Sequence, residues 1–327
     1  MPVYDPRGGG NAHIDVVLSN ISIQITNEEF VGGQLFPAVR VRKQSDKYYV
    51  YGNENTIPAL DPGGDVRAPA AVATEIPGVA VSLDTYFCTE HAVSIAVSDE
   101  ERENVDSPLS PDRDGTERVT SQVLLGRELA IHTLVTSTGN FGTGYSVTLS
   151  GTDQWSDYAN SDPIDDWKTG RDKIHSGIFT LPNVGVIPYE VMSQLEDHPD
   201  FIERIKYSQI GILTEDLIGR MLRISKIIVP GAGYNTANPG QSESLAYIWG
   251  KDVLMANVPA RSGMKMPAFG YEFVWPVGGR EQVVERWRET ARVADVIRVR
   301  RRYDLKLTTL DSSDKAIAGY LIKAAVA

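Results

Sequence analysis

The run from Val79 to Val97 alternates: its odd positions are mostly apolar or aromatic, and its even positions are mostly small or polar. This period of two predicts a β-strand with one apolar face. At ~3.3 Å per residue a continuous strand here would be roughly 60 Å long, whereas strands usually have about 5–6 residues. Such a strand would extend beyond the core and project as a two-stranded arm. The alternative is two ordinary strands with a bend near Thr89.

A long helix is predicted for about residues 113–138. Asp114, followed by Glu117, is a suitable N-terminal cap, and no proline interrupts the segment that follows. Val119 and Val123 begin an apolar series near helical spacing. At 1.5 Å per residue the helix would be roughly 35 Å long, which is long for a globular domain.

The first forty residues are predicted to form an arm. Three consecutive glycines at 8–10 favour a flexible start, and Ile21 and Ile23 lie on one side of a partly alternating segment. Such a segment buries little by itself, so it must pair with another part of the chain or with another molecule.

Short helices and strands alternate from Ser161 onward, as in a compact α/β module. Helices are predicted to begin at Pro163 and Pro188 and to span 200–207 and 214–222. The predicted strands are 184–187, 224–229, 245–249, 252–258, 283–289, 295–307 and 317–326.

Composition narrows the class of protein. A chain of 327 residues suggests about two domains. The 32 Lys and Arg against 43 Asp and Glu give a net charge of −11, which disfavours nucleic-acid binding by overall charge. The one cysteine, Cys88, forms no intrachain disulfide. No apolar run reaches the roughly 18 residues of a membrane helix, and the first residues lack the apolar run of a signal peptide. We expect a soluble protein of the cytoplasm or of a particle assembled there.

No catalytic, cofactor-binding or metal-binding motif emerges. The 5 histidines are far apart, and no His-Glu-x-x-His, Gly-x-Ser-x-Gly or phosphate-loop motif occurs. Asp162 and Asp165 lie at a predicted helix N-terminus, where the helix dipole favours acids, so we interpret them as capping residues. The glycine-containing loop at Gly231 follows a strand, but Pro239 stands where a dinucleotide-binding helix would begin. We therefore expect no cofactor, no metal and no catalysis.

A basic strand is predicted at 295–307. Arg298, Arg300 and Arg302 face one way, and Arg301 interrupts the opposite, apolar face. The partners of this strand are either Asp and Glu of the same or a neighbouring subunit, or nucleic-acid phosphates. The surplus of acids favours the carboxylates.

Several segments resemble one family. Gly33–Val41 (GQLFPAVRV), running into Lys43–Tyr48 (KQSDKY), resembles the end of the N-terminal arm and the start of the extended loop in major capsid proteins of tailed double-stranded DNA bacteriophages. Gly319–Ile322 is similar to the closing strand of that family. The first helices of its axial domain are similar to Val191–Met192, Leu195, His198–Asp200 and Ile205–Tyr207.

The resemblance implies the Hong Kong 97-like capsid fold, which is of the α+β class. The parts it implies are an N-terminal arm (1–43), an extended β-hairpin loop (44–98), a peripheral domain (99–161 and 269–314) with a long spine helix (about 113–138), and an axial domain (162–268 and 315–327).

The resemblance also implies a structural function. The chain would be a viral major capsid protein that self-assembles into hexamers and pentamers of an icosahedral head enclosing double-stranded DNA without sequence specificity. Its other partners would be a separate scaffolding protein, a portal and a decoration protein, with no membrane. The virion, assembled in the host cytoplasm, would be its location. The inter-subunit contacts would include Tyr48, Tyr49, Tyr51, Phe87, Ile21 and Ile23.

Two other functions stay open. An encapsulin-like nanocompartment shell would share the fold but enclose protein cargo. An α/β enzyme would use the compact module alone, with Asp162, Asp165 or the Gly231 loop as its site, and would be a discrete monomer or dimer.

A shell of this chain is predicted to be non-covalent. Some relatives cross-link through a lysine of the extended loop, but 50–98 contains no lysine. Particles boiled in denaturing detergent should therefore give only monomer on a gel. A ladder of cross-linked oligomers would contradict this expectation.

Overall fold

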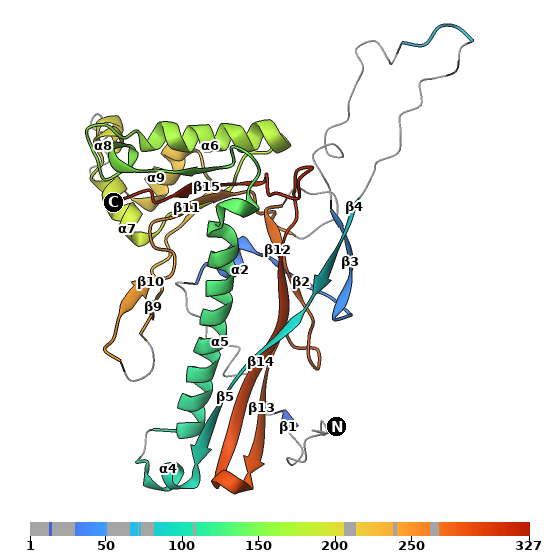
Figure 1. Ribbon diagram of the computed structural model, residues 1–327, viewed down its shortest axis with the longest axis vertical. Helices are drawn as coiled ribbons and strands as arrows, with labels where there is room; N and C mark the ends of the chain where they lie inside the picture. Colours follow the sequence, from blue (N-terminus) through green and yellow to red (C-terminus); the bar gives the residue numbers. More distant parts are fainter. Residues whose placement is uncertain are drawn as a thin grey trace.

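The computed structural model describes residues 13–14, 30–50, 66–70, 72, 82–106, 109–205, 214–237, 241–261 and 268–327. These parts form an elongated molecule (Figure 1). A long sheet and a long helix occupy one end, and a second sheet surrounded by shorter helices occupies the other.

The long sheet is built around its longest strand, β14. One edge of β14 pairs antiparallel first with β13 and then with β12, and its other edge pairs with β5. β2 continues the sheet beside β12, and β1 adds a short pair to β13. The strands are β1 (His13–Ile14), β2 (Ala38–Arg40), β5 (Thr89–Ser98), β12 (Gly270–Val274), β13 (Gln282–Glu289) and β14 (Ala294–Leu307).

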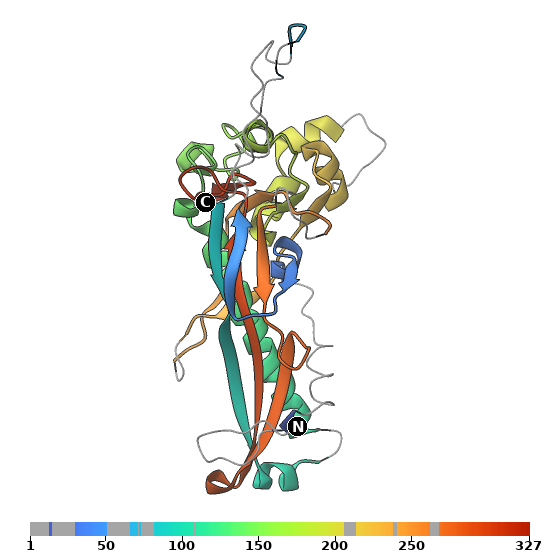
Figure 2. The ribbon, with the colours of Figure 1, turned by 90° about the vertical axis from the view of Figure 1, so that its right-hand side faces the viewer.

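The helix α5 (Pro111–Thr136) lies along this sheet, as Figure 2 shows from the side. Pro111 stands at its N-terminus, where the fixed φ of proline suits the first turn. The helix therefore begins before Asp114, the cap that the sequence suggested. Its apolar stripe packs on the sheet in a cluster of Val97, Val119, Val123, Val284, Ile297 and Val299. The predicted long helix is confirmed.

The alternating run forms two strands, β4 (Ser82–Phe87) and β5, which are separated at Cys88. A single continuous strand is therefore wrong for the described part of this run, and the predicted bend is confirmed. Cys88 is buried, and its backbone N–H donates to the Gln44 carbonyl at 2.8 Å. β4 pairs antiparallel with β3 (Ser45–Val50), so the two strands form a ladder beside the long sheet (Figure 1).

The bend also exchanges the faces of the run. Along β5 the odd-numbered Val93 and Val97 pack toward α5, as the alternation predicts. Along β4 the even-numbered Tyr86 is buried, while Leu83 and Phe87 are 55% and 57% exposed. The apolar face of β4 is thus turned away from the core of its own chain.

The second, shorter sheet has the strand order β6-β15-β11-β7-β8. Its strands are β6 (Ser146–Thr148), β7 (Val184–Val186), β8 (Lys226–Ile228), β11 (Val253–Ala256) and β15 (Gly319–Lys323). The helices around it are α6 (Pro163–Ile178), α7 (Tyr189–Glu196), α8 (Pro199–Ile205) and α9 (Glu215–Leu222). The remaining elements are α2 (Gly32–Leu35), α4 (Asp99–Asn104), β9 (Gly233–Asn235), β10 (Leu245–Tyr247) and short 3₁₀ turns at Thr138–Asn140, Gly151–Asp153 and Thr290–Arg292.

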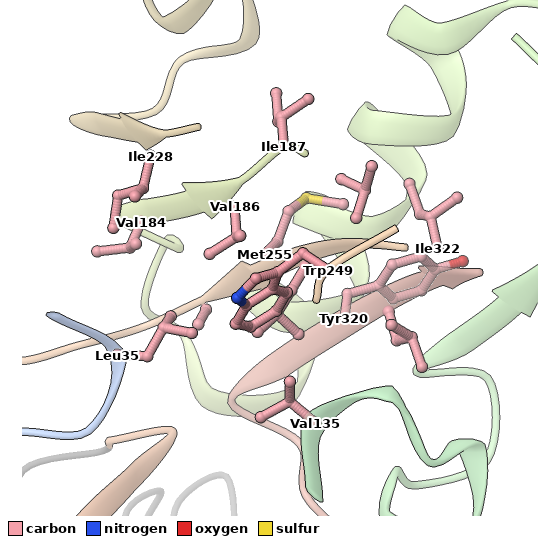
Figure 3. Close-up of a cluster of buried hydrophobic side chains, with 14 of the residues drawn as sticks. Leu35, Val135, Val184, Val186, Ile187, Ile228, Trp249, Met255, Tyr320 and Ile322 are labelled. Carbon is pink, nitrogen blue, oxygen red and sulfur yellow. The ribbon is translucent and has the colours of Figure 1, made fainter. Parts of the chain in front are cut away.

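One core joins the two ends of the molecule. Val135 from the last turns of α5 and Leu35 of α2 pack in the same cluster as Met255 and Ile322 of the short sheet (Figure 3). Trp249 is 1% exposed in this cluster. The C-terminal end of α5 is therefore embedded in the second module, while its N-terminal part lies on the long sheet.

Two neighbouring charged residues in the middle of α5 hold these parts together. Arg127 binds the fully buried carboxylate of Glu272 on β12 at 2.6 Å, and Arg301 of β14 binds the same carboxylate at 2.9 Å. Glu128 accepts backbone N–H bonds from Val31 and Gly32 at 3.0 and 2.9 Å. It also accepts the indole N–H of Trp249 at 2.9 Å. A buried charge needs polar partners, so these bonds fix α5 directly against three other segments, and through Glu272 also against β14.

Glu272→Gln should destabilise the unassembled subunit strongly. The amide keeps the shape of the side chain but leaves the buried Arg127 guanidinium without its anion and removes the nearer of the two anions of Arg301, which costs about 3–5 kcal/mol of unfolding free energy. Urea unfolding, followed by circular dichroism, measures this loss of unfolding free energy. The exposed pair Arg113–Glu117 supplies the control: Glu117→Gln should change the free energy by less than about 0.5 kcal/mol. Equal losses in the two variants would contradict the role given to Glu272.

Candidate functional site

The predicted contact residues that the structure describes lie on the β3–β4 ladder. The ring of Tyr48 contacts that of Phe273 with centroids 5.0 Å apart, and its hydroxyl donates to Asp84 at 2.8 Å. Burial raises the pKa of Tyr48. Tyr48 therefore packs largely against its own chain, whereas Phe87 is exposed. Tyr49 pairs with Leu83 through the backbone register. Tyr51, Ile21 and Ile23 lie outside the described residues.

The exposed face of β4 is an apolar stripe. Leu83, Thr85 and Phe87 occupy alternate positions on the solvent side of the strand. A groove of about 480 Å³ lies at the end of the ladder where β3 stops and β4 begins. It is bounded by β4, the end of α5 and β14. Its lining residues are Val50, Leu83, Asp84, Leu134, Asn140, Leu305, Lys306, Leu307, Leu310 and Asp314. Exposed apolar residues beside such a groove are typical of a protein–protein contact surface.

Carboxylates of the same chain pair with the basic strand. Arg298 and Arg300 both bind Glu285 of β13, whose side chain is 1% exposed. Arg302 binds Glu90 of β5 at 2.5 Å, and Arg300 reaches the same carboxylate at 3.4 Å. The three arginines lie on the sheet face opposite α5, because Val299 and Ile297 of β14 point toward that helix.

Arg301 faces the other way, toward α5. Its guanidinium binds Glu272 at 2.9 Å and lies 3.7 Å from Glu281. Arg301 interrupts the apolar face because it binds the buried carboxylate of Glu272. Arg127 binds the same carboxylate. Contact of Arg298, Arg300, Arg301 or Arg302 with DNA or with a neighbouring subunit stays a prediction.

An ionic cluster closes the far end of the long sheet. The pKa of Asp99 is lowered because Arg288 binds its carboxylate. Asp295 accepts from Arg286 at 2.6 Å and lies 2.9 Å from Arg102. The cluster joins α4, α5, β13 and β14 through Asp99, Arg102, Asp112, Arg286, Arg288 and Asp295.

One set of side chains has the composition of a nucleophilic triad. His198 Nε2 lies 3.1 Å from Ser161 Oγ, and His198 Nδ1 lies 3.6 Å from the Asp200 carboxylate. However, the backbone N–H of Asp200 donates to Nδ1 at 3.3 Å, and a backbone N–H can only donate. The proton of the neutral ring is therefore on Nε2 and points at Ser161, whereas a triad requires it on Nδ1. Ser161 in turn donates to the Asp157 carbonyl at 2.7 Å.

The set acts as a structural clip between the start of α8 and the segment before α6. Only the folded chain brings Ser161 and His198 together, so the sequence did not indicate the pair. Asp162 caps α6 by accepting the Asp165 N–H at 2.9 Å, as predicted. The Gly231 loop leads into β9 and not into a helix.

Neither a metal centre nor a membrane span is found in the described parts of the chain. Within them, no group of three or more His, Cys, Asp or Glu side chains could hold a metal ion. Their helices are also too short or too polar to cross a bilayer.

His198→Asn should weaken the pH dependence of stability. Burial lowers the pKa of His198, so as the pH falls below about 6.5 the unfolded chain binds a proton that the folded chain excludes. The unfolding free energy of the subunit should therefore decrease from about pH 6.5 downward. The asparagine can still accept the Asp200 N–H but does not titrate, so the decrease should be smaller. Denaturation midpoints of the native chain and the variant at pH 7.5 and 5.5 measure this decrease in stability.

The exposed His175 supplies the control for this experiment. His175→Asn makes the same substitution outside the clip, and a larger change of slope in His198→Asn than in His175→Asn is the expected result. An unchanged slope in His198→Asn would contradict the clip.

Comparison with known proteins supports a structural role. No protein-family model matches the sequence. The chain is 28% identical over 264 residues to a protein of Burkholderia phage BcepMu named major capsid protein, covering 79% of this chain and 82% of the relative. It is 29% identical over 241 residues to the major capsid protein of Pseudomonas phage JBD67, covering 72% and 74%.

Solved structures agree in fold. A phage-related protein from Bordetella bronchiseptica RB50 matches with a TM-score of 0.73 and 22% identity, over 96% of this chain and 98% of that one. The mature capsid of bacteriophage PhiM1 matches with a TM-score of 0.55 and 11% identity, over 99% and 91%. The predicted Hong Kong 97-like fold is confirmed, as is the resemblance to phage major capsid proteins, and the relatives support a structural shell protein of a phage head.

Proposed function

We propose that this chain is the major subunit of an icosahedral phage head, assembling into hexamers and pentamers that enclose double-stranded DNA. The observation that carries the proposal is the β3–β4 ladder, which turns Leu83 and Phe87 away from the core of its own chain. The homologous capsid proteins and the shared fold support it.

The physical argument rests on the incompleteness of one copy. An isolated two-stranded ladder is marginal in water, and exposed leucine and phenylalanine gain free energy only when another surface covers them. In a ring, each copy offers one surface to the next and receives a different surface from the previous one. Repetition of this contact covers every ladder, so the closed shell is the stable state.

The wider assignments follow from the same proposal. Residues 1–43 act as an arm, 44–98 as the extended loop, and the long-sheet and short-sheet modules as peripheral and axial domains. Tyr49, Tyr51, Ile21 and Ile23 add inter-subunit contacts. The head is assembled in the host cytoplasm with a separate scaffolding protein and a portal, and a decoration protein is a further partner. The shell function needs no catalytic turnover.

The charge of the basic strand supports loose, sequence-independent contact with DNA. Glu285 and Glu90 already bind Arg298, Arg300 and Arg302. The charges left over for phosphates are few, so packed DNA is not held tightly.

The test compares the native chain with Leu83→Asp/Phe87→Asp. The native chain, expressed with its scaffold, should give closed shells in negative-stain microscopy. The double variant should give soluble subunits with unchanged circular dichroism and no shells, because burying two carboxylates in an apolar contact is costly. Leu83→Val/Phe87→Leu is the matched control, since it changes the same two positions but keeps the stripe apolar, and it should still form shells.

Three outcomes would contradict the proposal. A native chain that remains a monomer or dimer in light scattering would indicate the enzyme alternative. Particles from virus-producing cells that hold protein cargo and no nuclease-protected DNA would indicate a nanocompartment. Normal shells from the double variant would remove the ladder from the assembly contact.

A further inference from the structure

A basic groove lies between α6, α8 and α9, on a chain whose net charge is −11. It has a volume of about 270 Å³. Its described lining residues are Ile164, Trp167, Lys168, Arg171, Arg204, Met221, Leu222 and Arg223, and none of these carries a carboxylate. The groove therefore combines an apolar floor with a rim of positive charge.

Two of these cations lack a neutralising partner in the parts of the chain that the structure describes. Arg171 binds Asp172 at 3.1 Å, and Lys168 lies 3.9 Å from Asp165. Arg204 and Arg223 form no ion pair with a described acid, and both side chains are exposed. Arg223 ends α9 in the left-handed conformation at φ 57°, with its N–H bonded to the Arg220 and Gly219 carbonyls. Its backbone is thereby fixed at the rim of the groove.

The opposite side of α9 is acidic. Glu215 and Asp216 open the helix, and the Asp216 side chain is 91% exposed. Arg220, 79% exposed and 3.7 Å from Asp216, neutralises it weakly because solvent screens such a pair. A second groove of about 270 Å³ is lined by Glu215, Asp216, Gly219, Arg220, Ile224, Ser225 and Ile227, so two carboxylates face one guanidinium there. One helix of 8 residues thus separates a basic surface from an acidic one.

We infer that the basic groove of one copy binds the acidic first turn of α9 in the next copy around the ring. The inference rests on the proposed shell function and names the contact between the proposed axial domains. A rotational ring joins two different surfaces of the subunit, and these two are complementary in charge. Like-charged copies repel one another, so a complementary pair at every junction favours the ring and sets its register.

Charge reversal tests the pairing. Arg204→Glu/Arg223→Glu places acid against acid, and Glu215→Arg/Asp216→Arg places base against base. Each double variant should reduce ring yield about tenfold or more, because the repulsion recurs at every junction. The quadruple variant restores opposite charges at each junction and should form both hexamers and pentamers. Native mass spectrometry and negative-stain microscopy of the full chain measure these yields.

A mixture of the two double variants gives a sharper outcome. An acidic groove then pairs only with a basic α9, so the two variants must alternate around the ring. Alternation closes with six copies but not with five, and the mixture should therefore form hexamers without pentamers. Arg204→Lys/Arg223→Lys is the control that keeps the charge, and it should assemble like the native chain.

The outcomes separate this inference from the proposed function. If Arg204→Glu/Arg223→Glu assembles normally, the pairing is wrong while the shell function stands. If it assembles normally but loses affinity for a short DNA duplex, the groove binds phosphate and the pairing is again wrong. If the native chain forms no rings, the proposed function itself fails. Circular dichroism of every variant confirms that loss of rings is not loss of fold.

Discussion

The buried charges on α5 are the constraint on which the rest of the structure depends. Arg127 and Glu128 are adjacent, yet one binds the long sheet through Glu272 and the other binds α2 and Trp249. Neither charge can be left unpaired away from water. The long sheet, α2 and the short-sheet module therefore meet at one fixed place on the helix.

Apolar side chains are not buried to the same extent in all parts of the molecule around this fixed centre. The core is continuous from the end of α5 into the short sheet, as Figure 3 shows, and Val135 and Ile322 are fully buried in it. The β3–β4 ladder does the opposite at Leu83 and Phe87. A rigid body with an exposed ladder suits the proposed shell subunit, in which other copies would cover the ladder.

Periodicity allowed most of the elements to be predicted, because it is a local property of the chain. The strand expected at 295–307 is β14 (Ala294–Leu307), and the final strand lies within the range expected for it. The bend at Cys88 was an alternative that only the fold decided. The pairing of Glu272 with Arg127 joins residues 145 positions apart, and the Ser161–His198 contact depends equally on tertiary structure. A charged residue within an apolar face, such as Arg301, was the one local signal of a buried partner.

The basic strand has a consequence for the life of the container. Because Glu285 and Glu90 balance its arginines from within the same chain, its folding requires no polyanion. In the proposed shell the charges of this strand are therefore balanced whether or not DNA is enclosed, and DNA could enter or leave without removing a counter-charge.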